Sequence, residues 1–79
     1  MKRILITGAS SGIGMHLTYL YLSMGWHVIA CGRSLSKLQA AFQSERPALT
    51  LCTFDINQST EVITKLKQIE ALDLVILNA

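Results

Sequence analysis

Apolar and polar positions along the chain follow two alternating patterns. Short apolar runs, typical of buried strands, fall at residues 3–7, 27–31, 49–54 and 72–77. Longer segments with apolar residues at three- and four-residue intervals, the pattern of a helix with one buried face, lie between them at residues 13–24, 34–42 and 59–69. The chain is therefore predicted to alternate strand and helix throughout.

Each helical segment has a set of apolar residues that the spacing places on one face. The residues predicted to face the core are Ile13, Leu17, Leu20 and Met24 in the first segment, Leu35, Leu38, Ala41 and Phe42 in the second, and Val62, Ile63, Leu66 and Ile69 in the third. Ser34 or Ser36 is the expected N-cap of the second helix, and Gly25 is expected to end the first.

Strands joined through helices run parallel and are connected by right-handed crossovers. The predicted fold class is α/β, a Rossmann-type doubly wound parallel sheet of about four strands in the order 3-2-1-4, within a single domain. Ligands of such sheets bind beyond the carboxyl ends of the strands, where the winding reverses. Four segments should therefore converge at that edge, at residues 8–14, 32–34, 55–56 and 78–79.

Composition narrows the class of protein. The 79 residues are 51% hydrophobic and 15% charged, with one proline, which fits a compact core and argues against disorder. The net charge of +2 is too small to suggest a nucleic-acid surface. No secretory signal or membrane span is evident, and Cys31 and Cys52 lack metal-ligand spacing. We expect a soluble cytoplasmic protein with reduced thiols and no metal.

A glycine-rich turn follows the first predicted strand. Gly8, Gly12 and Gly14 have the spacing Gly-x-x-x-Gly-x-Gly and lead directly into the first predicted helix. Unpaired amides of the first helical turn and the positive end of the helix dipole can bind a pyrophosphate there. The alternative is an ordinary strand-to-helix connection that uses small residues for tight packing. The surrounding strands and helix favour nucleotide binding.

Four motifs together resemble the amino-terminal half of the short-chain dehydrogenase/reductase family. They are, in order, Thr7-Gly8-Ala9-Ser10-Ser11-Gly12-Ile13-Gly14, Cys31-Gly32-Arg33-Ser34, Phe54-Asp55-Ile56 and Leu77-Asn78-Ala79. Two features depart from the family pattern: Leu77 stands where the Asn-Asn-Ala-Gly motif has its first asparagine, and the given sequence stops before the final glycine.

The resemblance implies a set of cofactor-binding residues. Those expected around the pyrophosphate and adenine ribose are Gly8, Ser10, Gly12, Ile13 and Gly14, and Ser11 is also expected to be a cofactor-binding residue. Asp55 and Ile56 would flank the adenine ring, and Asn78 and Ala79 would support the sheet beside the cofactor.

The end of the second predicted strand bears on cofactor preference. A carboxylate there would bind the ribose hydroxyls of NAD and repel the 2′-phosphate of NADP, and no acidic residue occurs from Ala30 to Ser36. Arg33 offers a planar cation suited to phosphate, with Ser34 and Ser10 as possible hydroxyl donors. The sequence favours NADP(H) over NAD(H), and the alternative is a solvated surface arginine.

No catalytic residue is predicted in this chain. Family members use a tyrosine with a lysine nearby in sequence and a serine, and neither Tyr19 nor Tyr21 has such a lysine; both are expected to serve packing or an interface. His16 and His27 are expected to be structural or solvent-facing. The leading hypothesis is the dinucleotide-binding part, residues 1–79, of an NADP(H)-dependent oxidoreductase that moves hydride to or from a carbonyl or alcohol, with the catalytic half absent.

Two alternatives stay open. The chain could be a non-catalytic NADP(H)-binding or sensing domain. It could instead be an inert remnant that self-associates through its fourth strand, whose apolar run Leu72 to Leu77 would form a long exposed edge. A homo-oligomer formed through that edge, or a complex with the missing half, is expected.

Overall fold

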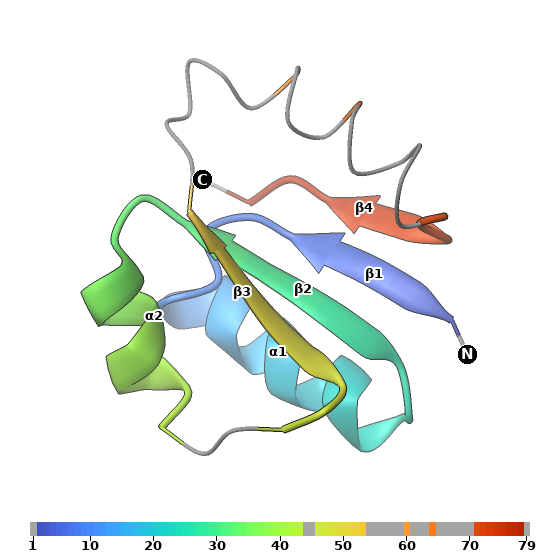
Figure 1. Ribbon diagram of the computed structural model, residues 1–79, viewed down its shortest axis with the longest axis horizontal. Helices are drawn as coiled ribbons and strands as arrows, with labels where there is room; N and C mark the ends of the chain where they lie inside the picture. Colours follow the sequence, from blue (N-terminus) through green and yellow to red (C-terminus); the bar gives the residue numbers. More distant parts are fainter. Residues whose placement is uncertain (1, 44–45, 54–59, 61–63, 65–70, 79) are drawn as a thin grey trace.

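A parallel sheet is the centre of the fold. The computed structural model describes residues 2–43, 46–53, 60, 64 and 71–78 (Figure 1). In these residues the elements are β1 (Arg3–Ile6), α1 (Gly12–Ser23), β2 (His27–Gly32), α2 (Leu35–Ala41), β3 (Leu49–Thr53) and β4 (Leu74–Ile76). The strands pair in parallel in the order β3-β2-β1-β4. The predicted fold class and strand order are confirmed.

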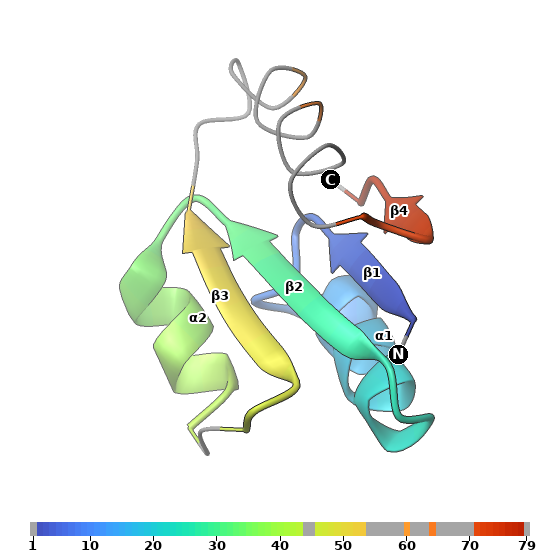
Figure 2. The ribbon, with the colours of Figure 1, turned by 45° about the vertical axis from the view of Figure 1, so that its right-hand side comes forward.

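Both described helices cover the same face of the sheet, as Figures 1 and 2 show. Ile4 and Ile6 of β1 and Val28 of β2 are fully buried on that face. They pack with Leu38 and Phe42 from the region of α2 and with residues of α1. Because side chains alternate along a strand, every second residue of β1 and β2 belongs to this core.

A second, smaller core lies on the opposite face. Leu5, Ile29 and Cys31 are buried there, and Cys52 and Val75 are among the half-buried residues that pack against them. Strand β2 is therefore buried on both faces. This explains why its apolar run is nearly continuous rather than alternating.

The inward face of α1 differs from the prediction. Ile13, Leu20 and Met24 are 70%, 45% and 58% exposed, whereas the buried residues of the helix are Gly14 and Thr18. The helix lies so close to the sheet that small residues fill the line of contact, and larger side chains on either side of that line are half-buried. Of the predicted stripe, Leu17 is half-buried and packs against the core, so the prediction holds for Leu17 and fails for the other three residues.

Helix α2 agrees with the sequence in part. Leu38 is buried and Phe42 is 6% exposed, but Leu35, at the first helical position, is 49% exposed, so the prediction for Leu35 was wrong. Ser34 is the N-cap, and its hydroxyl accepts a hydrogen bond from the Lys37 amide at 3.4 Å. Gly25 adopts φ +84° just after α1, as expected of a residue that ends a helix.

Strand β4 spans Leu74–Ile76, so the predicted strand over residues 72–77 was too long. In the described sheet β4 does lie at the edge, as predicted. The Asp73 carboxylate accepts a hydrogen bond from the Arg3 amide at 2.8 Å, and the Asp73 amide donates to the Arg3 carbonyl at 2.9 Å. These bonds fix the start of pairing with β1. Leu72 precedes them and packs into the smaller core, while Leu77 lies beyond the strand and is 71% exposed.

The third predicted helix, residues 59–69, lies mostly outside the described residues. Thr60 and Thr64 are described and helical, and the Thr64 hydroxyl donates to the Thr60 carbonyl at 2.8 Å. Within the part of the chain that the structure describes, no helix has the length and apolar character needed to cross a bilayer.

Two leucines of α2 provide a matched test of this packing. Leu38→Ala removes a fully buried side chain, and we expect it to cost about 2–5 kcal/mol, comparable with the whole stability of so small a core. Leu35→Ala, in the same helix, should cost less than about 0.5 kcal/mol because that side chain is largely exposed. Urea unfolding followed by circular dichroism measures both. Equal losses of unfolding free energy in the two variants would contradict the assignment of the core-facing side of α2.

Candidate functional site

The glycine-rich turn is fastened to two strands at the carboxyl edge of the sheet. The Thr7 amide donates to the Ile76 carbonyl of β4 at 3.0 Å, and the Ala9 amide donates to the Cys31 carbonyl of β2 at 3.0 Å. Ala9 is fully buried. The turn is therefore held where the strand order changes direction, between β1 and β4.

Thr7 and Asn78 form a reciprocal pair across this edge. The Thr7 hydroxyl accepts a hydrogen bond from the Asn78 amide at 2.8 Å and donates one to the Asn78 carbonyl at 3.1 Å. The Asn78 side-chain amide also donates to the Gly8 carbonyl at 3.3 Å. Asn78, two residues after the end of β4, is thus joined to the turn by both its backbone and its side chain.

Gly8 and Gly14 are required by close approach. A Cβ on Gly8 would lie 2.6 Å from the Asn78 carbonyl oxygen, and Gly8 also has φ +63°. A Cβ on Gly14 would overlap the Gly8 carbonyl oxygen and lie 2.7 Å from the Gly8 carbonyl carbon. All of these neighbours are backbone atoms, so relieving the overlap would require the main chain itself to shift. At these two positions the tight-packing interpretation is correct.

Gly12 has a different environment. It adopts φ +58°, and a Cβ there would meet no atom of the described residues within 4 Å. Ser11, the N-cap of α1, makes no side-chain hydrogen bond to the helix, and the first turn of α1 contains no acidic residue. Ser11, Gly12 and Ile13 are exposed. The amides of this first turn are therefore available to an outside acceptor, with no negative charge in that turn to oppose an anion.

Thr18 supports the start of α1 from inside the core. Its hydroxyl is fully buried and donates to the Gly14 carbonyl at 2.8 Å. Sequence reasoning missed both Thr18 and Thr7. For Thr18 a signal was present, because a hydroxyl four residues after a helical glycine can bond back to that glycine's carbonyl.

The end of β2 lies beside the turn. Gly32 is the last residue of β2, and a Cβ there would come within 3.4 Å of the Leu38 side chain. Arg33 follows and is exposed, while Ser34 is half-buried and its hydroxyl lies 3.0 Å from the Ser36 hydroxyl. Through the bond from the Ala9 amide to the Cys31 carbonyl, this strand end and the turn form one unit.

The structure thus brings together several of the residues that the sequence singled out. The turn from Gly8 to Gly14, including Ser10 and Ser11, meets Asn78 directly and reaches the end of β2 through Ala9. Asp55, Ile56 and Ala79 lie outside the described residues. Thr53, the last residue of β3, pairs with Gly32 at the same edge of the sheet.

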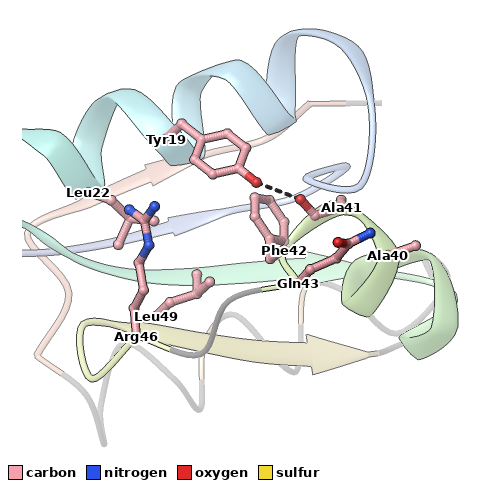
Figure 3. Close-up of a pocket in the computed structure, with 8 residues that line it drawn as sticks. All are labelled: Tyr19, Leu22, Ala40, Ala41, Phe42, Gln43, Arg46 and Leu49. Atoms are coloured by element: carbon pink, nitrogen blue, oxygen red, sulfur yellow. Dashed lines mark hydrogen bonds between the residues drawn. The ribbon is translucent and has the colours of Figure 1, made fainter.

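A cavity of about 350 Å³ lies elsewhere, where α1 and α2 end (Figure 3). Its lining includes Tyr19, Phe42 and Arg46. The Tyr19 hydroxyl donates to the Ala41 carbonyl at 2.6 Å, and the Tyr19 and Phe42 ring centroids are 5.2 Å apart. Because both helices run back from the carboxyl edge, their ends lie near the amino edge of the sheet. This cavity is therefore remote from the turn.

The other residues considered for chemistry have structural contacts or face solvent. The Tyr21 ring packs edge-on against Trp26 with centroids 5.0 Å apart. The Nε2 atom of His27 lies 3.0 Å from the Thr50 hydroxyl, and His16 is exposed.

The chain is similar to known dehydrogenases over its whole length. A family model described as short chain dehydrogenase matches residues 2–79. A 3-oxoacyl-acyl-carrier-protein reductase of Rickettsia bellii is 35% identical over 75 residues, which are 95% of this chain and 31% of the relative. The chain therefore spans about a third of that relative's length.

Solved structures agree in fold. A serine dehydrogenase complexed with NADP+ is 25% identical with a TM-score of 0.76, and the match covers 92% of this chain and 31% of that one. A 4-hydroxyisoleucine dehydrogenase complexed with NADH is 26% identical with a TM-score of 0.71, covering 95% of this chain and 32% of that one.

The pair of Thr7 and Asn78 can be tested by removing one hydroxyl. Thr7→Val keeps the shape of the side chain but leaves the Asn78 amide and carbonyl without their partner, so we expect a loss of about 1–3 kcal/mol of stability. Hydrogen exchange at the Asn78 amide should become faster. Thr7→Ser, which retains the hydroxyl, is the control. A Thr7→Val chain with unchanged unfolding and exchange would show that the pair contributes nothing.

Proposed function

Because the chain belongs to the short-chain dehydrogenase family, we propose that it supplies the NADP(H)-binding part of an oxidoreductase. The complete fold would move a hydride between the nicotinamide and a carbonyl or alcohol substrate. The observation that carries this proposal is the open side of the glycine-rich turn, where exposed first-turn amides of α1 surround Gly12. The nicotinamide supplies the hydride chemistry, and the residues of this chain hold the coenzyme.

The space beside Gly12 suits a dinucleotide. A pyrophosphate must approach backbone amides closely, and the positive φ of Gly12 with open space in the Cβ direction permits that approach. The residues proposed to surround the pyrophosphate and the adenine ribose are Gly8, Ser10, Ser11, Gly12, Ile13 and Gly14. Gly8 and Gly14 contribute by holding the turn in place, and the other four have exposed or half-exposed positions.

The preference for NADP(H) rests on the end of β2. Similar structures bind NADP+ in one protein and NADH in another, so the fold alone does not decide between them. Arg33 is exposed next to the turn, and no acidic residue occurs from Ala30 to Ser36. A guanidinium group here can bind the 2′-phosphate in a bidentate manner. Ser34 and Ser10 are proposed as hydroxyl donors to the same phosphate.

The remaining proposed contacts lie along the same edge. Asn78 holds the turn against β4, and Ala79 would continue that support. Asp55 and Ile56, which follow β3, would flank the adenine ring. Because the chain spans about a third of the relative's length, the activity and substrate of the whole protein are proposals. We further propose a cytoplasmic location and association with a second copy or with the catalytic portion.

A non-catalytic NADP(H)-binding or sensing role is the second candidate. Neither tyrosine of this chain has a lysine at the family's separation, which is compatible with this candidate and with the oxidoreductase alike. Tight NADPH binding by this chain as a monomer, measured by fluorescence with light scattering, would favour it. Binding that appears only after the catalytic portion is added would favour the oxidoreductase. A chain that self-associates and binds no NADPH would be the inert remnant.

The proposed cofactor preference is tested at Arg33. Arg33→Ala should weaken NADPH binding roughly 10- to 100-fold, because it removes a charge-assisted hydrogen bond to the 2′-phosphate. NADH lacks that phosphate, and its affinity should change less than about threefold. Arg46→Ala is the matched control, since Arg46 is exposed but lines the remote cavity. Dissociation constants from fluorescence titration measure these effects. Equal losses for both cofactors at Arg33 would defeat the assignment.

A further inference from the structure

The two cysteines of the chain face each other across neighbouring strands. Cys31 of β2 is in register with Cys52 of β3, and both side chains contribute to the smaller core opposite α1 and α2. The Cys31 thiol donates a weak hydrogen bond to the Ile29 carbonyl at 3.8 Å, and Cys52 is a half-buried residue packed against the same core. Neighbouring strands lie about 4.7–4.9 Å apart, and disulfides span Cα separations of roughly 4.4–6.8 Å. The backbone therefore allows a bond between these residues.

The cysteine pair is connected to the glycine-rich turn. The Cys31 carbonyl accepts the hydrogen bond from the Ala9 amide at 3.0 Å, and Cys31 is followed by Gly32 and Arg33 at the end of β2. A shift of the Cys31 peptide would therefore move both the turn and the arginine. Within the described residues, Cys31 is the position of β2 whose backbone bonds directly to the turn.

We propose that Cys31 and Cys52 are a dithiol redox site, which a small-molecule disulfide such as glutathione disulfide converts to an intrachain disulfide. We further infer that closure weakens cofactor binding at the turn, and this second step rests on the proposed function. Residues in register on neighbouring parallel strands point their side chains to the same face of the sheet. Their Cβ atoms are then separated by about the distance between the strands. Because Cβ atoms in disulfides are only about 3.8 Å apart, closure must draw the two strands together and displace the Cys31 peptide.

The exchange proceeds in two balanced steps. The half-buried Cys52, as thiolate, attacks one sulfur of glutathione disulfide and releases one glutathione thiolate. Cys31 then loses its proton to the medium and attacks the Cys52 sulfur, which forms the intrachain bond and releases the second glutathione. Two protein thiols are oxidised, and one glutathione disulfide is reduced to two thiols. Burial and the neighbouring Cys52 raise the pKa of the Cys31 thiol, so Cys31 is the second nucleophile.

The bond formed this way should be easily reversed. Geometry that departs from the preferred separation strains a disulfide and makes it more reducible, and strained disulfides are typically labile or regulatory rather than structural. The site would therefore respond to the ratio of glutathione disulfide to glutathione.

Thiol counting on the full chain tests the proposal directly, because the sequence contains two cysteines. The chain is incubated at low concentration with glutathione disulfide, alkylated, and analysed by intact mass and non-reducing peptide mapping. We expect a monomer that has lost two hydrogen atoms, with Cys31 linked to Cys52 and full reversal by dithiothreitol. Cys31→Ala should instead stop with glutathione on Cys52. In the untreated chain, one phenylarsine oxide should consume both thiols, a test of proximity that needs no variant.

Three results would overturn the dithiol site: both thiols persisting, glutathione remaining on Cys52 of the original chain, or a disulfide between two chains.

NADPH affinity tests the coupling, and we expect at least about fivefold weaker binding after oxidation, the low end of typical coupling between sites. Unchanged affinity in the disulfide form would refute the coupling. If the reduced chain binds no NADPH, the proposed function fails, while the thiol count still decides the redox site.

Discussion

The amino end of α1 can meet the end of β1 only because Gly8 and Gly14 have no side chains. A Cβ at either position would collide with backbone atoms of the facing segment. This close approach puts the Gly8 carbonyl within reach of the Asn78 side-chain amide, and it places the first turn of α1 at the carboxyl edge of the sheet. Substituting the glycines would separate helix, strand and β4 end together, so the geometry of the site depends on this one contact.

The three glycines of the turn therefore have two functions. Gly8 and Gly14 make the packing possible, while Gly12 is exposed at the start of α1, where the described residues leave open the space that a Cβ would occupy. Around this turn, Thr7 and Asn78 hold β4, and Ala9 holds β2 at the peptide of Cys31. The same backbone link joins the proposed phosphate site to the cysteine pair beneath it. Binding of an anion and the redox state of two thiols would thus act on one short stretch of chain.

The sequence predicted the architecture better than the contacts. The alternation of apolar strand runs with helical segments was sufficient to predict the strand order, because parallel strands joined by crossovers can be arranged in few ways. The inward face of α1 was wrong at Ile13, Leu20 and Met24, which are exposed. The buried residues of the helix are the small Gly14 and Thr18, and Leu17, as predicted, packs against the core while half-buried. The length of β4 was wrong because the bonds of Asp73 to Arg3 set where pairing starts. The pairing of Thr7 with Asn78 joins residues 71 positions apart, and no local pattern encodes so distant a partner.

The cavity between the ends of α1 and α2 is not the site that the fold supports, since ligands of parallel sheets bind at the carboxyl edge. Nuclear magnetic resonance of the isotope-labelled chain, titrated with NADPH, separates the two locations. The account predicts that the largest amide shifts occur at residues 8–14 and at Gly32 and Arg33, at the turn and the adjoining strand end. Shifts confined to the surroundings of Tyr19, Phe42 and Arg46, or no shifts at all, would contradict it.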